Sequence, residues 1–131
     1  MSRAQPLVFI TGASSGIGQA LAARYLSEGW RVALLARRAA AMVQWVSEQG
    51  VSADRVRVYG ADVRDDAQVL QAAQRCLAEM GVPDVVVANA GISVGVDLSL
   101  AEDLPVLRDL YQTHVLAMAA TFQPFIAPMV Q

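Results

Sequence analysis

Short apolar runs alternate along the chain with longer segments in which apolar residues recur every three or four positions. The short runs are rich in β-branched residues and predict strands over 7–10, 31–36, 56–59 and 84–88. The longer segments predict four helices. The first begins near Gly16 and stops at Gly29, the second covers 38–49, the third ends before Gly81, and the fourth begins at Asp103 and continues past Met118. We expect Pro124 and Pro128 to kink or end the last helix.

Apolar residues at helical spacing predict which side of the third helix faces a core. They are Val69, Leu70, Ala73, Leu77 and Met80. Cys76 shares this stripe, so we interpret it as a small buried hydrophobic residue rather than a reactive thiol. Further along the chain, four large side chains predict packing in a core or an interface: Met118, Phe122, Phe125 and Met129.

Strands that alternate with helices favour a parallel sheet with helices on both faces. Right-handed crossovers then give a doubly wound, Rossmann-type α/β fold, for which we expect about four strands in the order 3-2-1-4. No repeat or linker interrupts the pattern, so residues 1–131 are predicted to form one domain.

The composition excludes several classes of protein. Of the 131 residues, 55% are hydrophobic and 17% charged, which suits a globular domain rather than a disordered chain. The net charge is -2 and the basic residues are scattered, so nucleic acid is not an expected partner. No apolar run approaches a membrane span and no signal pattern is present, so we expect no membrane contact and a cytoplasmic location. One cysteine and one histidine predict neither an internal disulfide nor a metal site.

A glycine-rich turn lies between the first predicted strand and the first predicted helix. It contains Gly12, Gly16 and Gly18, with Ser14, Ser15 and Ile17 between them. Such a turn lets backbone approach a dinucleotide pyrophosphate closely and directs the N–H groups of a helix N-terminus towards it. The alternative is a tight turn with no ligand.

The end of the second predicted strand carries Arg37 and Arg38. A dinucleotide fold selective for NAD usually has an acid here, about 20 residues after the glycines, to bind the ribose 2′-hydroxyl. A guanidinium instead suits a 2′-phosphate, so we predict NADP (NADPH) as the cofactor. Two alternatives remain: the arginines solvate a helix start, or the fold binds S-adenosylmethionine, although that reading expects an acid in place of Arg37.

Three motifs in order resemble the short-chain dehydrogenase/reductase family: Thr11-Gly12-x-x-x-Gly16-x-Gly18, Asp62-Val63 and Asn89-Ala90-Gly91. The resemblance implies an oxidoreductase that interconverts alcohol and carbonyl groups of a small molecule by hydride transfer. It also implies that Asp62 and Val63 contact the adenine, that Asn89, Ala90 and Gly91 lie beside the cofactor, and that Ile92 lies near the nicotinamide ribose. Asp62 as a turn residue and Asn89 as a partner of backbone groups remain alternatives.

The chain departs from that family in its catalytic residues. The family uses a serine, a tyrosine and a lysine four residues after the tyrosine, whereas all ten basic residues here are arginine. We therefore expect these residues beyond position 131 and interpret the chain as the truncated cofactor-binding part of a longer enzyme. The resemblance places His114 where the family has an asparagine of a proton relay; it is interpreted either as an alternative relay or as a packed or surface side chain.

A sheet that stops at its fourth strand leaves an open edge, so we also expect a homo-oligomer. The alternative function is a non-catalytic dinucleotide-binding or self-associating module.

Overall fold

The computed structural model describes residues 5–14, 16–91 and 95–131, so the predictions for Ser15 and Ile92 lie outside the described residues. Four parallel strands form one sheet in the order β3-β2-β1-β4, as predicted. The strands are β1 (Leu7–Thr11), β2 (Arg31–Ala36), β3 (Val56–Gly60) and β4 (Val85–Val87). Because all four strands are parallel, their carboxyl ends meet at one edge of the sheet.

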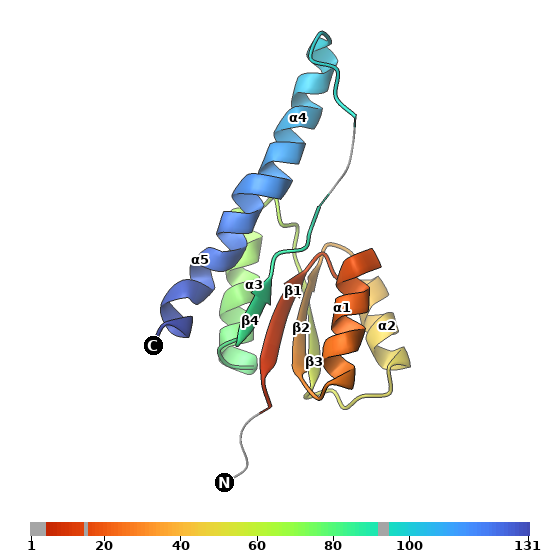
Figure 1. The fold of residues 1–131 in the computed structure, drawn as a ribbon, viewed down its shortest axis with the longest axis vertical. Helices are drawn as coiled ribbons and strands as arrows, with labels where there is room; N and C mark the ends of the chain where they lie inside the picture. The colour runs from red at the N-terminus through yellow and green to blue at the C-terminus, as the bar shows by residue number, and fades with distance from the viewer. Residues whose placement is uncertain (1–4, 15, 92–94) are drawn as a thin grey trace.

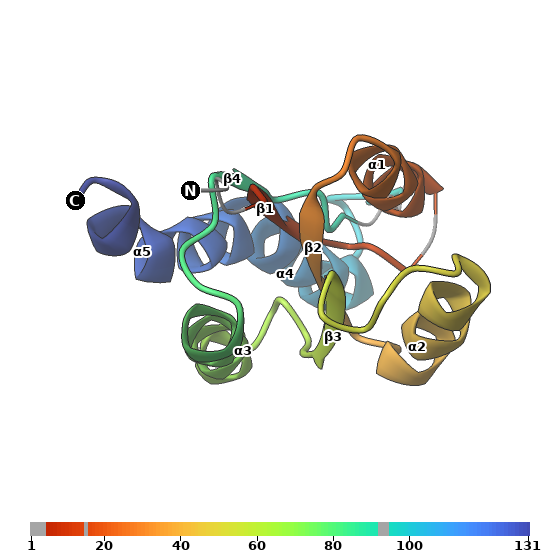
Figure 2. The ribbon, with the colours of Figure 1, turned by 90° about the horizontal axis from the view of Figure 1, so that it is seen from below.

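Helices cover both faces of this sheet, which confirms the doubly wound α/β fold (Figures 1 and 2). On one face, α1 (Gly16–Ser27) and α2 (Ala39–Glu48) enclose a core that includes Val8, Ile10 and Met42. On the other face, α3 (Asp66–Glu79) and α5 (Ala117–Met129) pack on a core that includes Phe9 and Phe125. Alternate residues of β1 therefore enter opposite cores, as the two-residue period of a strand requires.

The α3 helix begins where a local signal predicts, but its buried face is narrower than the sequence pattern predicts. The Asp65 side chain caps its N-terminus by accepting from the backbone N–H groups of Ala67 and Gln68. Val69 and Cys76 are fully buried, and burial raises the pKa of the Cys76 thiol to about 12, which confirms that this cysteine is a buried hydrophobic residue. Leu70 was predicted to face the core but is 43% exposed, because the core-facing stripe of α3 is narrower than the apolar pattern.

The last predicted helix is longer and less regular than expected. A short 3₁₀ turn, η1 (Ala101–Asp103), leads into α4 (Leu104–Tyr111), a π-helical segment η2 (Gln112–Leu116) and then α5. The helix continues through Pro124 and ends at Met129, directly after Pro128, so the predicted end near these prolines is confirmed at Pro128 and not at Pro124. Phe125 lies between them, is 1% exposed and packs on Phe9 with tilted rings whose centroids are 4.8 Å apart.

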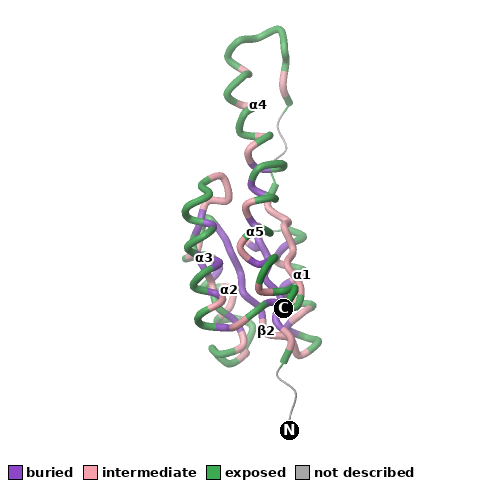
Figure 3. The backbone as a smooth tube through the Cα atoms, turned by 90° about the vertical axis from the view of Figure 1, so that its left-hand side faces the viewer, coloured by how far each residue is buried: buried purple, intermediate pink, exposed green. Residues whose placement is uncertain are grey.

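The α4 helix projects beyond the sheet and carries mostly exposed residues (Figures 1 and 3). Of the large side chains predicted to pack in a core or interface, Phe125 is buried, whereas Met118, Phe122 and Met129 are 36–44% exposed. In the portion of the chain that the structure describes, no helix is long and apolar enough to cross a membrane.

Candidate functional site

A groove of about 600 Å³ runs along the edge where the carboxyl ends of the strands meet. Most of the residues predicted for the cofactor site line it: Gly12, Ser14, Ile17, Arg37, Arg38, Asp62, Val63, Asn89, Ala90 and Gly91. Gly16 and Gly18 do not line the groove. Within residues 5–14, 16–91 and 95–131, no group of three His, Cys, Asp or Glu side chains could hold a metal ion.

The turn after β1 requires glycine for two different physical reasons. Gly12 has φ 64° and Gly16 has φ 57°, a left-handed backbone that side chains disfavour. A Cβ on Gly12 would also lie 2.6 Å from the Ala90 Cα, and a Cβ on Gly18 would overlap the Gly12 carbonyl oxygen. Gly18 thus shapes the groove from beneath, by allowing α1 to approach the turn.

Hydrogen bonds tie this turn to the end of β4. The Thr11 Oγ1 accepts from the backbone N–H groups of Asn89 (3.0 Å) and Ala90 (3.2 Å). In return, the Asn89 side-chain amide donates to the Gly12 carbonyl oxygen at 3.2 Å. Asn89 therefore does satisfy a backbone group, as one alternative predicted, and by doing so it holds two motifs that are distant in the sequence against one wall of the groove.

Two exposed arginines follow β2 at the same edge. Arg37 and Arg38 line the groove, and neither forms an ion pair with any residue that the structure describes. Arg38 is the residue before α2, yet its side chain makes no capping hydrogen bond. Exposure also fits the alternative in which the arginines solvate the helix start, and both guanidinium groups are accessible to an anion in the groove.

Asp62 is held by an arginine that the sequence analysis did not select. The Asp62 Oδ1 accepts from the Arg64 backbone N–H (3.0 Å) and Nε (3.1 Å), and its Oδ2 accepts from Arg64 Nη2 (2.9 Å). Chiefly through these bonds, Arg64 lowers the pKa of Asp62 below its ordinary value. Arg64 Nη1 also reaches Asp109 Oδ2 on α4 at 3.2 Å. Its position two residues after Asp62 was a usable signal for Arg64; nothing local pointed to Asp109.

The π-helical segment places two more residues at the other end of the groove. Thr113 lines it and is 6% exposed, and its hydroxyl has no hydrogen-bond partner among the described residues. His114 packs against Gly91, since a Cβ on that glycine would lie 2.8 Å from the imidazole Cε1. His114 is otherwise exposed and lies next to the groove rather than lining it, so its role as a relay or as a packed or surface side chain stays a prediction.

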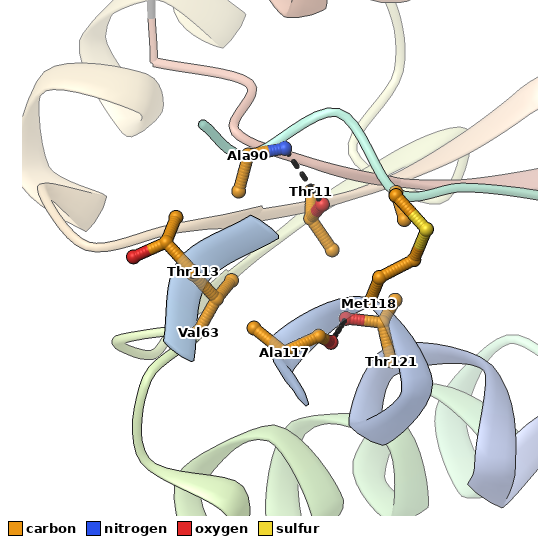
Figure 4. A pocket seen from close by; sticks show the side chains of 8 residues that line it. Thr11, Val63, Ala90, Thr113, Ala117, Met118 and Thr121 are labelled. Carbon is orange, nitrogen blue, oxygen red and sulfur yellow. Dashed lines mark hydrogen bonds between the residues drawn. The ribbon is translucent and has the colours of Figure 1, made fainter. Parts of the chain in front are cut away.

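A second, small pocket, drawn in Figure 4, shares Val63, Ala90 and Thr113 with the groove. Its volume is about 10 Å³, enough for about one water molecule and far too small for a cofactor. Eight residues line it: Thr11, Val63, Ala88, Ala90, Thr113, Ala117, Met118 and Thr121. Within it, Thr121 turns its hydroxyl back to the Ala117 carbonyl at 2.7 Å. The large groove is therefore the candidate binding site.

Comparison with known proteins shows the same architecture in longer chains. D-threitol dehydrogenase of Mycolicibacterium smegmatis is 34% identical over 116 residues, which is 88% of this chain and 43% of that protein. The crystal structure of a short-chain dehydrogenase from Streptomyces avermitilis is 33% identical in sequence and superposes with a TM-score of 0.86. The matched region is 98% of this chain and 46% of the Streptomyces chain. The chain thus spans less than half the length of these two proteins.

Two further solved structures contain nicotinamide cofactors. The 3-ketoacyl-(acyl-carrier-protein) reductase of Brucella melitensis, complexed with NADH, is 26% identical with a TM-score of 0.84 over 94% of this chain and 50% of that one. An alcohol dehydrogenase from Thermococcus sibiricus, complexed with 5-hydroxy-NADP, is 29% identical with a TM-score of 0.83 over 96% of this chain and 54% of that one. The family model for short chain dehydrogenases matches residues 6–131. With the sheet order, the glycine turn and the Asn89 contacts, this match shows that the chain belongs to the short-chain dehydrogenase family.

Proposed function

We propose that this chain is the NADP-binding part of an oxidoreductase that interconverts an alcohol and a carbonyl group in a small molecule. The observation that carries the proposal is the pair of exposed guanidinium groups of Arg37 and Arg38, which line the groove without an ion pair to any described residue, on the strand end where an NAD site usually has an acid. Solved relatives contain NADH in one case and an NADP derivative in another, so the preference rests on these two residues.

The residues present fit such a cofactor along the length of the groove. Gly12 of the glycine turn lines the groove, and the N-terminus of α1 follows it, which suits a pyrophosphate. In the proposal, Asp62 and Val63 bind the adenine at one end, and Asn89, Ala90 and Gly91 bind the nicotinamide ribose at the other. When bound, the nicotinamide supplies or accepts the hydride; these residues hold and orient it.

The proton transfer of this reaction needs a group that titrates near neutral pH. The tyrosines here are followed four positions later by Gly29, Val63 and Val115, so none has the lysine that would lower its pKa. We propose that the serine and the Tyr-x-x-x-Lys pair belong to a longer protein of cytoplasmic location. The reading frame after residue 131 tests this: a serine-bearing strand followed by Tyr-x-x-x-Lys is expected there, and its absence predicts binding without turnover.

Cofactor preference is tested by titrating the purified protein with NADPH and with NADH and following nicotinamide fluorescence. A charge-assisted contact to the 2′-phosphate is worth about 1.5–3 kcal/mol, which predicts a preference for NADPH of about 10-fold to 150-fold. Arg37→Asp is expected to shift the preference towards NADH, because the carboxylate repels the phosphate and accepts from a 2′-hydroxyl.

Arg24→Asp is the matched control, since Arg24 is an exposed arginine on α1 that pairs with Glu28 outside the groove. It is expected to leave the preference unchanged. Absence of NADPH binding by the wild-type protein contradicts the proposed function. An unchanged preference in Arg37→Asp contradicts the assignment of the 2′-phosphate to Arg37.

A second candidate function, self-association, is favoured by a stripe of exposed apolar side chains on α4, η2 and α5. The stripe consists of Leu104, Leu107, Tyr111, Val115, Met118, Phe122, Ile126 and Met129, each at least 36% exposed and three or four positions from the next. A stripe with this period suits pairing with another helix. We infer that a second copy of the chain covers it; coverage by further residues of a longer chain is the alternative outcome.

A further inference from the structure

We propose that Arg64 is a positioning residue for cofactor preference: by holding the Asp62 carboxylate, it keeps Arg37 free for the 2′-phosphate of NADPH. The inference rests on the proposed function. It concerns a residue whose own charge is already engaged, in contrast to Arg37 and Arg38.

The first step is the geometry of the Asp62–Arg64 pair. Nε and Nη2 of Arg64 each donate to a different oxygen of the carboxylate, and the Arg64 backbone N–H donates as well. Such a two-pronged contact fixes both the position and the plane of a carboxylate. The pair is half-buried, with side-chain exposures of 33% for Arg64 and 26% for Asp62, so solvent screens it only in part.

The second step is the surroundings of that carboxylate. Asp62, Arg37 and Arg38 line the same groove, and the charge of Arg37 acts on Asp62 after the stronger effect of Arg64. An unheld carboxylate in this position would attract Arg37 and would repel a phosphate. Because Arg64 neutralises Asp62, the groove presents the positive charge of Arg37 and Arg38 to the ligand.

The third step is the anchor that holds Arg64 itself. Its Nη1 donates to Asp109 on α4 at 3.2 Å, so each of its three guanidinium nitrogens has a carboxylate partner. Asp109 is 57% exposed, so this contact is weak compared with the two-pronged one. Arg64 also lines the groove, but because its nitrogens are engaged by carboxylates, the inference is that it acts on the ligand through Asp62.

The test measures the ratio of NADPH to NADH affinity, because adenine contacts are common to both ligands and cancel in the ratio. Arg64→Met is expected to lower the ratio about tenfold, since the freed carboxylate competes with the phosphate for Arg37. Arg64→Lys keeps the charge and is expected to retain most of the ratio. Asp62→Asn in the Arg64→Met background is expected to restore the ratio, because the competing charge is gone.

Arg75→Met is the matched control, as Arg75 also contacts a carboxylate, that of Glu79, outside the groove. It is expected to leave the ratio unchanged. An unchanged ratio in Arg64→Met overturns the inference. A lowered ratio that Asp62→Asn does not restore also overturns it, because Arg64 then binds the phosphate itself. A wild-type protein that binds NADPH and NADH equally contradicts the proposed function. That outcome is measured on the wild type alone, so it is distinguishable from a failure of the Arg64 inference, which is measured on the variants.

Discussion

Single residues at the strand ends shape the backbone around the groove. Thr11 is 1% exposed and its hydroxyl joins β1 to the residues that follow β4. Gly12 and Gly18 have no room for a methyl group, since either Cβ would meet backbone or the Asn89 side chain. Thr11, Gly12 and Gly18 thus act by letting the backbone segments at the strand ends approach one another. Of these three residues, Gly12 lines the groove and the other two do not.

Two threonines in the same region predict opposite results for the same substitution. Thr11→Val removes an acceptor from two N–H groups and is expected to lower the free energy of unfolding by about 1–3 kcal/mol. Thr113→Val removes a buried hydroxyl that has no partner among the described residues, so stability is expected to stay the same or to rise. Denaturant unfolding of both variants checks this; equal losses would contradict the hydrogen-bond assignment.

At the scale of elements, strand and helix positions followed from local periodicity. The α5 helix continues through Pro124, where Phe125 packs on Phe9 in a tertiary contact, and it ends at Met129, directly after Pro128. The α3 helix is the opposite case, because its start is determined locally by the Asp65 side chain.

The Asp65 cap gives a prediction at this scale. Asp65→Ala removes the acceptor for two N–H groups at the start of α3 and is expected to cost about 1 kcal/mol of stability. Asp66→Ala is the control: Asp66 is in the first turn but is not the capping residue, so only its interaction with the helix dipole is lost, roughly 0.3–1 kcal/mol at most. Thermal unfolding followed by circular dichroism compares the two; a larger loss for Asp66→Ala would contradict the cap.

At the scale of the whole molecule, the apolar stripe of α4, η2 and α5 is an exposed surface. In the described residues β4 pairs only with β1, so the same side of the molecule also has an open sheet edge. Large exposed apolar patches mark interaction surfaces.

We therefore expect the purified protein to form a dimer or larger assembly in sedimentation velocity. Leu107→Glu, at a position 40% exposed, is expected to shift the assembly towards monomer, because a charge in the interface is costly to bury. Val43→Glu is the control: Val43 is also exposed but lies on α2, on the opposite face of the sheet. A monomeric wild-type protein would contradict self-association and would favour coverage by further residues of a longer chain.

The sequence by itself determined the strand order, the helix faces in outline, and the residues that meet at the strand ends, because apolar periodicity and glycine turns are local properties and right-handed crossovers then restrict the order of parallel strands. Arg37, Asp62 and Asn89 could be placed in one groove on that basis alone. Only the tertiary structure decided that Asn89 bonds Gly12, that His114 packs on Gly91, and that Arg64 bridges Asp62 and Asp109. Apart from the Asp62–Arg64 pair, those contacts join residues far apart in the chain, so they depend on how helices and strands pack against one another, which no local pattern specifies.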